Sequence, residues 1–233
     1  MCKPTVSDST PDAASVMATH WVRLSCSPST TRPISTATMA SPPPVVPTLA
    51  FVPPRWWSEA DPLVHAAFDE LNAFLGERAF GAQLPEIFGE AVPQARRVIA
   101  AETAKSLHSA QARHRDSLTA PTLDLIDMGE TVSARHYLTA LDWRTVLRAG
   151  LDAVFERCDA IVTAASRMPG DCHADDALVW SFVGLPVVSL PLLAGDDGAP
   201  IGVALIGRRG EDARLLRTAR WLQDSVSQGR ATS

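Results

Sequence analysis

Three short apolar runs in the last third of the chain limit what it can fold into. They lie at 160–162, 187–190 and 201–206. Continuous apolar runs of this length are typical of strands buried on both faces of a sheet that helices cover. A turn containing Gly198 joins the last two runs, and a helix is expected at 210–223. The chain is therefore expected to have an α/β fold.

A short strand at 48–52 and three helices are expected upstream of these runs. Asp61 can cap the first helix, and Pro62 suits its first position because no hydrogen-bonded N–H is lost there. A second helix is expected from Pro93 and a third from Ser133, a possible N-cap. The predicted apolar stripe of the first helix is Leu63, Ala67, Leu71, Phe74 and Leu75.

Composition divides the chain into three parts. Residues 1–47 are rich in Ser, Thr and Pro and show no sustained apolar period, so we interpret them as a disordered or non-homologous leader. Residues 48–225 carry the periodic patterns and form the expected ordered region. Residues 226–233 are interpreted as a tail.

Charge and cysteine usage exclude several classes of function. The net charge is −5, and acidic and basic residues are mixed along the chain, which argues against a nucleic-acid partner. No apolar run approaches the ~20 residues that span a bilayer, so no membrane association is expected. The four cysteines are scattered without a C-x-x-C motif, which is typical of reduced thiols in a cytoplasmic protein.

The segment from 184 to 203 resembles a known family. It reads GLPVVSLP at 184–191 and DGAPIGV at 197–203, and Pro191 is expected to end its strand. This order of pieces resembles the C-terminal part of the amidase signature family, serine hydrolases that cleave carbon–nitrogen amide bonds. The resemblance implies a partial amidase-signature fold over 48–225, with a mixed sheet flanked by helices. It also implies a small-molecule amide as the substrate of the full-length enzyme, with no cofactor and no metal.

The residues that perform the family's reaction are missing from this sequence. Members use a Ser–cis-Ser–Lys triad and a Gly-Gly-Ser-Ser-Gly run, because a serine hydroxyl needs a base and the oxyanion needs N–H donors. This sequence contains no Ser-Ser pair and no Gly-Gly pair. Its two lysines are Lys3, in the leader, and Lys105, within the second predicted helix. No catalytic residue is therefore assigned, and we expect the chain to be inactive alone.

Three interpretations follow from this combination. The first is a C-terminal fragment of an amidase, truncated at the gene level, which could associate with a missing N-terminal half. The second is a non-catalytic binding or regulatory remnant that folds alone. The third is part of the amidase-type subunit of a tRNA-dependent amidotransferase, which shares the fold.

Two residues are candidates for contact with a substrate. Ser166 follows the strand at 160–162, where α/β proteins place ligands. Trp180 precedes the turn at Gly184, in a region that approaches the substrate cavity in the family, although an ordinary aromatic core contact is the favoured interpretation. The cluster of Asp, Cys and His at 171–176 is interpreted as a polar loop rather than a metal site, because no second Cys/His group has suitable spacing.

Overall fold

The computed structural model describes residues 46–168, 174–195 and 198–231. These ranges belong to one compact unit, Ser41–Ser233. Apart from residues 46 and 47, the leader predicted at 1–47 lies outside the described residues. The same holds for the Asp-Cys-His part of the cluster at 171–176.

The centre of this unit is a five-stranded mixed sheet with the order β2-β1-β3-β5-β4. Strand β1 (Leu49–Phe51) pairs in parallel with both β2 (Ala79–Gly81) and β3 (Ala160–Ala164). Strand β5 (Pro200–Ile206) pairs antiparallel with β3 on one side and with β4 (Val187–Ala194) on the other. The expected α/β fold with a mixed sheet is confirmed.

Six α-helices accompany the sheet within the described residues. They are α2 (Pro62–Leu75), α3 (Ala91–His114), α4 (Ala120–Glu130), α5 (Ala134–Phe155), α6 (Ala174–Val183) and α7 (Asp212–Ala231). Asp61 caps α2, because its Oδ1 accepts the Leu63 N–H at 2.8 Å. Ser133 Oγ accepts the His136 N–H at 3.2 Å at the start of α5. Both predicted helix starts are therefore confirmed.

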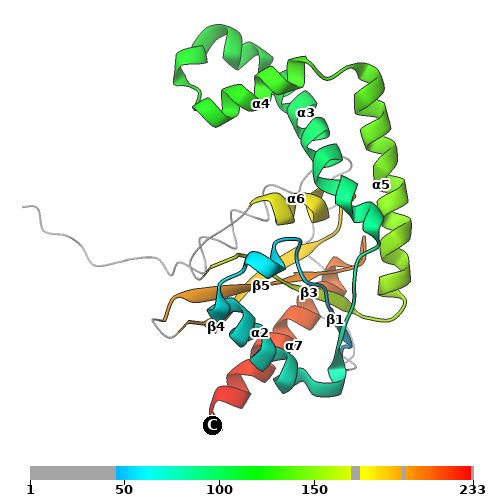
Figure 1. Ribbon diagram of the computed structural model, residues 1–233, viewed down its shortest axis with the longest axis vertical. Helices are drawn as coiled ribbons and strands as arrows, with labels where there is room; N and C mark the ends of the chain where they lie inside the picture. The colour runs from blue at the N-terminus through cyan, green and yellow to red at the C-terminus, as the bar shows by residue number, and fades with distance from the viewer. Residues whose placement is uncertain (1–45, 169–173, 196–197, 232–233) are drawn as a thin grey trace, which may run out of the picture. The chain divides into compact units, whose positions relative to one another are not determined.

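The helices cover the two faces of the sheet as separate layers (Figure 1). Side chains alternate along each strand, so Leu49 contributes to one core and its neighbour Ala50 to the other. The first core packs α2 and α7 against the sheet, and the second packs α3, α5 and α6. Helix α4 packs on α3. Because both faces are covered, β3 and β5 are almost wholly buried, as their apolar runs predict.

The buried stripe of α2 differs from the predicted one. Leu63 and Phe74 are 38% and 49% exposed, whereas Val64 and Phe68 are fully buried against the sheet. Both sets of residues have helical spacing and share Ala67, Leu71 and Leu75. Periodicity alone therefore allows either stripe, and the contact with the sheet selects one.

Strand β4 corrects the interpretation of 187–190 as a doubly buried strand that ends at Pro191. It is an edge strand whose side chains alternate in exposure, and it continues through Pro191 to Ala194. Its pairing with β5 shifts in register between Leu190 and Leu193. A proline lacks the N–H that an inner strand must donate, but an edge strand with an irregular register accommodates it.

Helix α7 extends beyond its predicted end at Gln223 to Ala231. Val226 is 9% exposed and belongs to the core formed with α2. The segment interpreted as a tail, 226–233, is therefore helical as far as Ala231. Helices α4 and α6 were not predicted, because Pro121, Gly129 and the polar residues at 171–176 are typical of loops.

Candidate functional site

The first candidate site is the loop 164–168, which begins at the last residue of β3. Ser166 is 3% exposed, and its hydroxyl donates a hydrogen bond to the Met168 carbonyl at 3.0 Å. Thr163, the fourth residue of β3, is equally buried. The predicted position of Ser166 just after a buried strand is correct, and its role in binding a substrate stays a prediction.

Contacts with two other elements hold this loop in place. The Ala165 N–H donates to the Gly202 carbonyl of β5 at 3.0 Å, and a β-carbon added at Gly202 would lie 2.9 Å from Ala165 Cβ. The Asp61 N–H donates to the Arg167 carbonyl at 2.9 Å, and the Arg167 guanidinium pairs with Glu59 at 3.2 Å. Hydrogen bonds to β5 and to the start of α2 thus fix the loop, so it can form a rigid wall of a binding site.

Trp180 lies within the core rather than beside an opening. It belongs to α6, is 6% exposed, and packs in the cluster that α3 and α5 form on the sheet. Ser189, interpreted from the sequence as a packed residue of a buried strand, is instead exposed on the edge strand β4. The expectation that Trp180 contacts a substrate stays a prediction.

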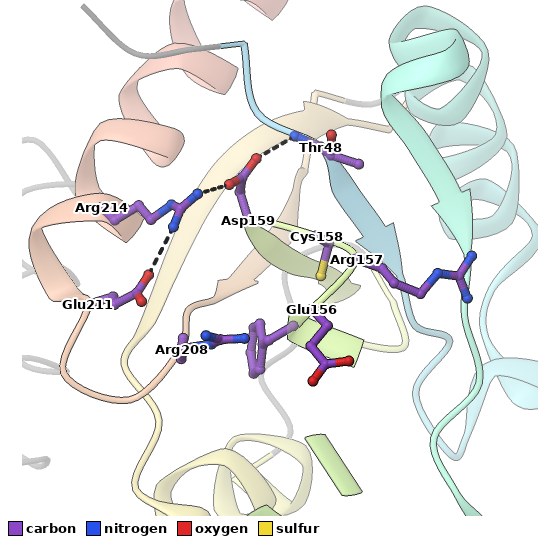
Figure 2. Close-up of a pocket in the computed structure, with 9 residues that line it drawn as sticks. Thr48, Glu156, Arg157, Cys158, Asp159, Arg208, Glu211 and Arg214 are labelled. Atoms are coloured by element: carbon purple, nitrogen blue, oxygen red, sulfur yellow. Dashed lines mark hydrogen bonds and ion pairs between the residues drawn. The ribbon is translucent and has the colours of Figure 1, made fainter. Parts of the chain in front are cut away.

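A pocket lies at the end of the sheet opposite the loop 164–168 (Figure 2). Its volume is about 430 Å³. It opens beside the amino-terminal ends of β1 and β3 and the carboxyl end of β5, whereas the loop 164–168 begins at the carboxyl end of β3. Its lining residues are Thr48, Phe155, Glu156, Arg157, Cys158, Asp159, Arg208, Glu211 and Arg214.

Asp159 organises the charges of this pocket. Its carboxylate accepts the Thr48 N–H at 2.7 Å and pairs with Arg214, which also pairs with Glu211 at 3.3 Å (Figure 2). The network joins the starts of β1, β3 and α7. Arg157 turns away from the pocket and lies over the Phe80 ring, 4.7 Å from its centroid. We interpret the paired charges as a structural junction. No sequence motif identified it, because Asp159 is more than 50 residues from both Thr48 and Arg214.

The Cys158 thiol in this pocket is unsuited to nucleophilic chemistry. It is buried, and its Sγ–H donates to the Val154 carbonyl at 3.4 Å. Burial, reinforced by the Asp159 carboxylate, raises the pKa of the Cys158 thiol to about 11. The thiol is therefore protonated at neutral pH, and the pocket lining contains no histidine to act as a base.

The described residues offer neither a metal centre nor a membrane-spanning helix. In the parts of the chain that the structure describes, no group of three or more His, Cys, Asp or Glu side chains is placed to hold a metal ion. None of the described helices combines the length and apolar character needed to cross a membrane.

Comparison with known families identifies the scaffold. A family model described as Amidase matches residues 64–216. The chain belongs to the amidase signature family. The resemblance inferred from the motifs at 184–203 is thereby confirmed, and the match extends through α2, α3, α4 and α5.

The relatives include proteins named as amidotransferase subunits and a protein named as an amidase. A glutamyl-tRNA(Gln) amidotransferase subunit of Prochlorococcus marinus (strain MIT 9303) is 35% identical over 105 residues, which cover 40% of this chain and 22% of that protein. An amidase of Pseudomonas putida is 25% identical over 185 residues, which cover 68% of this chain and 38% of that protein. The chain thus matches well under half the length of these curated relatives.

Solved structures show the same fold. A crystal structure of an amidase superposes with a TM-score of 0.67 and 22% sequence identity, covering 77% of this chain and 46% of that chain. This similarity supports the arrangement of sheet and helices, which is the amidase-signature fold.

The sequence motif expected to carry the catalytic residues of the amidase family does not occur in this chain. Lys105, the only lysine in the described part of the chain, lies exposed on α3. The sequence has no Ser-Ser and no Gly-Gly pair that could supply the nucleophile and the oxyanion loop. The family relationship therefore accounts for the scaffold, and the expectation that this chain carries no catalytic residue stays a prediction.

Proposed function

We propose that this chain is the C-terminal scaffold portion of an amide-hydrolysing unit and that it does not hydrolyse amides by itself. The observation that carries the proposal is the family fold without a Ser-Ser pair anywhere in the sequence. Lys105 cannot replace the missing base, because it is exposed on α3 with no serine pair for it to activate.

In this proposal the chain contributes one wall of the substrate cavity. The loop 164–168 is pinned by β5 and by the start of α2, and it begins at the carboxyl end of a buried strand, where α/β folds bind ligands. Ser166 would orient a small-molecule amide, and Trp180 would support the wall from the core. Water is the acceptor, and the chemistry of a serine hydrolase needs neither a metal nor a cofactor.

The nucleophile would come from a polypeptide equivalent to the N-terminal half of the family. Strand β4 is an edge with no described strand on its outer side, so it offers backbone groups for a further strand. The scattered cysteines without C-x-x-C support a cytoplasmic setting for this assembly. A nucleic-acid partner is not part of the proposal, because basic residues are not clustered along the sequence.

Reconstitution tests this proposal directly. The purified chain is incubated with aliphatic amides, aromatic amides and glutamine, alone and together with the N-terminal half of a complete amidase that carries the triad. We expect no ammonia release from the chain alone, and a co-eluting complex that releases ammonia when the two parts are mixed. The matched control is the same N-terminal half with its nucleophilic serine replaced by alanine, which should bind without turnover.

Two outcomes would contradict the scaffold proposal. Ammonia release by the chain alone, at a rate proportional to its concentration, would show that it carries its own nucleophile. A cooperatively folded monomer that never associates with the N-terminal half would favour the binding or regulatory remnant.

The relatives named as glutamyl-tRNA(Gln) amidotransferase subunits support a second candidate, a component that provides ammonia from glutamine. The reconstituted complex distinguishes it from a general amidase. Preference for glutamine over simple amides would favour the amidotransferase component, whereas the reverse preference would favour the amidase.

A further inference from the structure

A second, smaller pocket gathers three guanidinium groups from two distant segments. Arg148 projects from α5, and Arg208 and Arg209 lie in the turn between β5 and α7. The pocket has a volume of about 200 Å³, and Asp152 is the only acidic residue in its lining. We call it the arginine pocket. Its apolar wall is formed by Leu151, Phe155 and Leu185.

Backbone contacts hold the arginines in place. Arg148 Nε donates to the Val183 carbonyl at the end of α6, at a distance of 2.8 Å. Gly184 follows with φ +77, and a β-carbon there would lie 3.1 Å from Arg148 Nη2. The turn that bears Arg208 is anchored by the Gly207 N–H, which donates to the Pro186 carbonyl at 3.0 Å. The pocket is therefore built by fixed segments before any ligand arrives.

The arginines of the pocket form no recorded ion pair with the described residues, which holds for Arg148, Arg208 and Arg209 alike. In the neighbouring larger pocket, Asp159 and Glu211 are engaged by a different arginine. The carboxylates lining either pocket without a recorded ion pair are Asp152 and Glu156.

A fourth guanidinium lies close to the same place. Arg144 precedes Arg148 by one turn of α5 and lies over the Phe182 ring, 5.1 Å from its centroid. Arg144 Nε is buried and has no acceptor among the described residues. Burial, together with the positive charges of Arg209 and Arg144, lowers the pKa of the Arg148 guanidinium. Like charges brought this close repel one another unless an anion lies between them.

The chemistry of these groups indicates the class of ligand that suits the arginine pocket. A guanidinium presents several N–H donors in one plane and binds carboxylate or phosphate oxygens in pairs. We propose that the arginine pocket binds a small oxyanion, a phosphate or a carboxylate, held by Arg148 and Arg209 with its non-polar part against Leu151 and Leu185.

This site is separate from the proposed amide-binding wall. In the antiparallel pairing of β3 and β5, Ile206 lies opposite Ile161. The turn that carries Arg208 and Arg209 is therefore at the start of β3, while the loop 164–168 begins at its end. An anion in the arginine pocket would bind away from the reacting amide and would act as a structural or regulatory ligand.

Binding of simple anions to the 233-residue chain tests the proposal. Inorganic phosphate, acetate and benzoate are each titrated by calorimetry in a phosphate-free, low-salt buffer, with sodium chloride at matched ionic strength as the blank. We expect saturable binding of phosphate or of a carboxylate, and the preferred anion identifies which group the pocket takes. R209Q and R148Q should each weaken the binding at least ten-fold.

The control variant is R220Q, which removes an exposed arginine of α7 that does not line the pocket. Arg220 Nε lies 4.0 Å from Asp224 Oδ2. It should bind the anion like the wild type. R209Q provides the decisive comparison, because Arg209 is exposed and its replacement leaves the bond from Arg148 to Val183 intact. Heats that match the chloride blank for all three anions, or equal binding by R209Q and wild type, would overturn the proposal.

Discussion

Gly129 of α4 lies directly against Ala100 of α3, so close that a β-carbon at position 129 would clash with the Ala100 carbonyl oxygen. The same β-carbon would lie 2.8 Å from Ala104 Cβ. The contact between α3 and α4 therefore depends on a residue without a side chain. This explains why the glycine is needed within a helix, where it costs about 1 kcal/mol relative to alanine.

Gly129→Ala should destabilise the fold by about 2 kcal/mol or more, because the backbone of α3 cannot move away without loss of packing. The free energy of unfolding in urea, followed by circular dichroism, measures the effect. Gly89→Ala is the matched control, since a β-carbon at Gly89 meets no atom within 4 Å. Equal stability of the two variants would contradict the tight crossing of α3 and α4.

Ser166→Ala should cost about 1 kcal/mol of stability, because the hydrogen bond that the buried Ser166 hydroxyl donates to the Met168 carbonyl at 3.0 Å is lost. Ser189→Ala, on the exposed edge strand, should change the free energy of unfolding by less than about 0.5 kcal/mol. Thermal and urea unfolding of both variants provide the measurement. A larger loss of unfolding free energy for Ser189→Ala would show that another part of the protein or a second copy packs on the edge strand in solution.

Stability should fall in alkaline solution partly because of Cys158. Its thiol pKa is raised from 9.0 to about 11 in the folded chain, so the folded state retains a proton that the unfolded state has lost. The stability contributed by the buried thiol is complete below pH 9 and is lost as the pH rises towards 11. Between about pH 8 and about pH 10.5 the wild type should lose about 2 kcal/mol more than Cys158→Ala.

The measurement for Cys158 is the free energy of unfolding of both proteins across this pH range. Tyr137, whose pKa is also raised by burial and by Glu102, titrates in both proteins, and its contribution cancels in the difference. Parallel pH profiles would show that the thiol is not desolvated.

The outer edge of β4 should promote self-association of the purified chain. Val187 is 39% exposed on an edge strand of eight residues, and unpaired strand edges are templates for pairing between molecules. Val187→Lys should raise the concentration at which the chain remains monomeric several-fold, as measured by light scattering after size exclusion. Val146→Lys, at a residue 46% exposed on α5, is the control and should have little effect. A larger gain in monomer concentration for Val146→Lys than for Val187→Lys would show that the chain associates through its helices.

The sequence by itself predicted those features that depend on neighbouring residues. Asp61 and Ser133 start their helices because a side-chain oxygen reaches an N–H two or three residues later. The buried strands β3 and β5 were recognised because their apolar runs need helices on both faces. The absence of a Ser-Ser pair is likewise a property of the sequence alone, and it separates the family's scaffold from the family's reaction.

Only the tertiary structure decided the features that join distant segments. The edge position of β4 lets its strand continue through Pro191, although a proline normally ends a strand. Arg148 meets Arg208 and Arg209 only because α5 and the turn after β5 pack around the same end of the sheet, about 60 residues apart in the sequence. Local patterns contain no information on such encounters, because strand order and helix packing arise from contacts of the whole core.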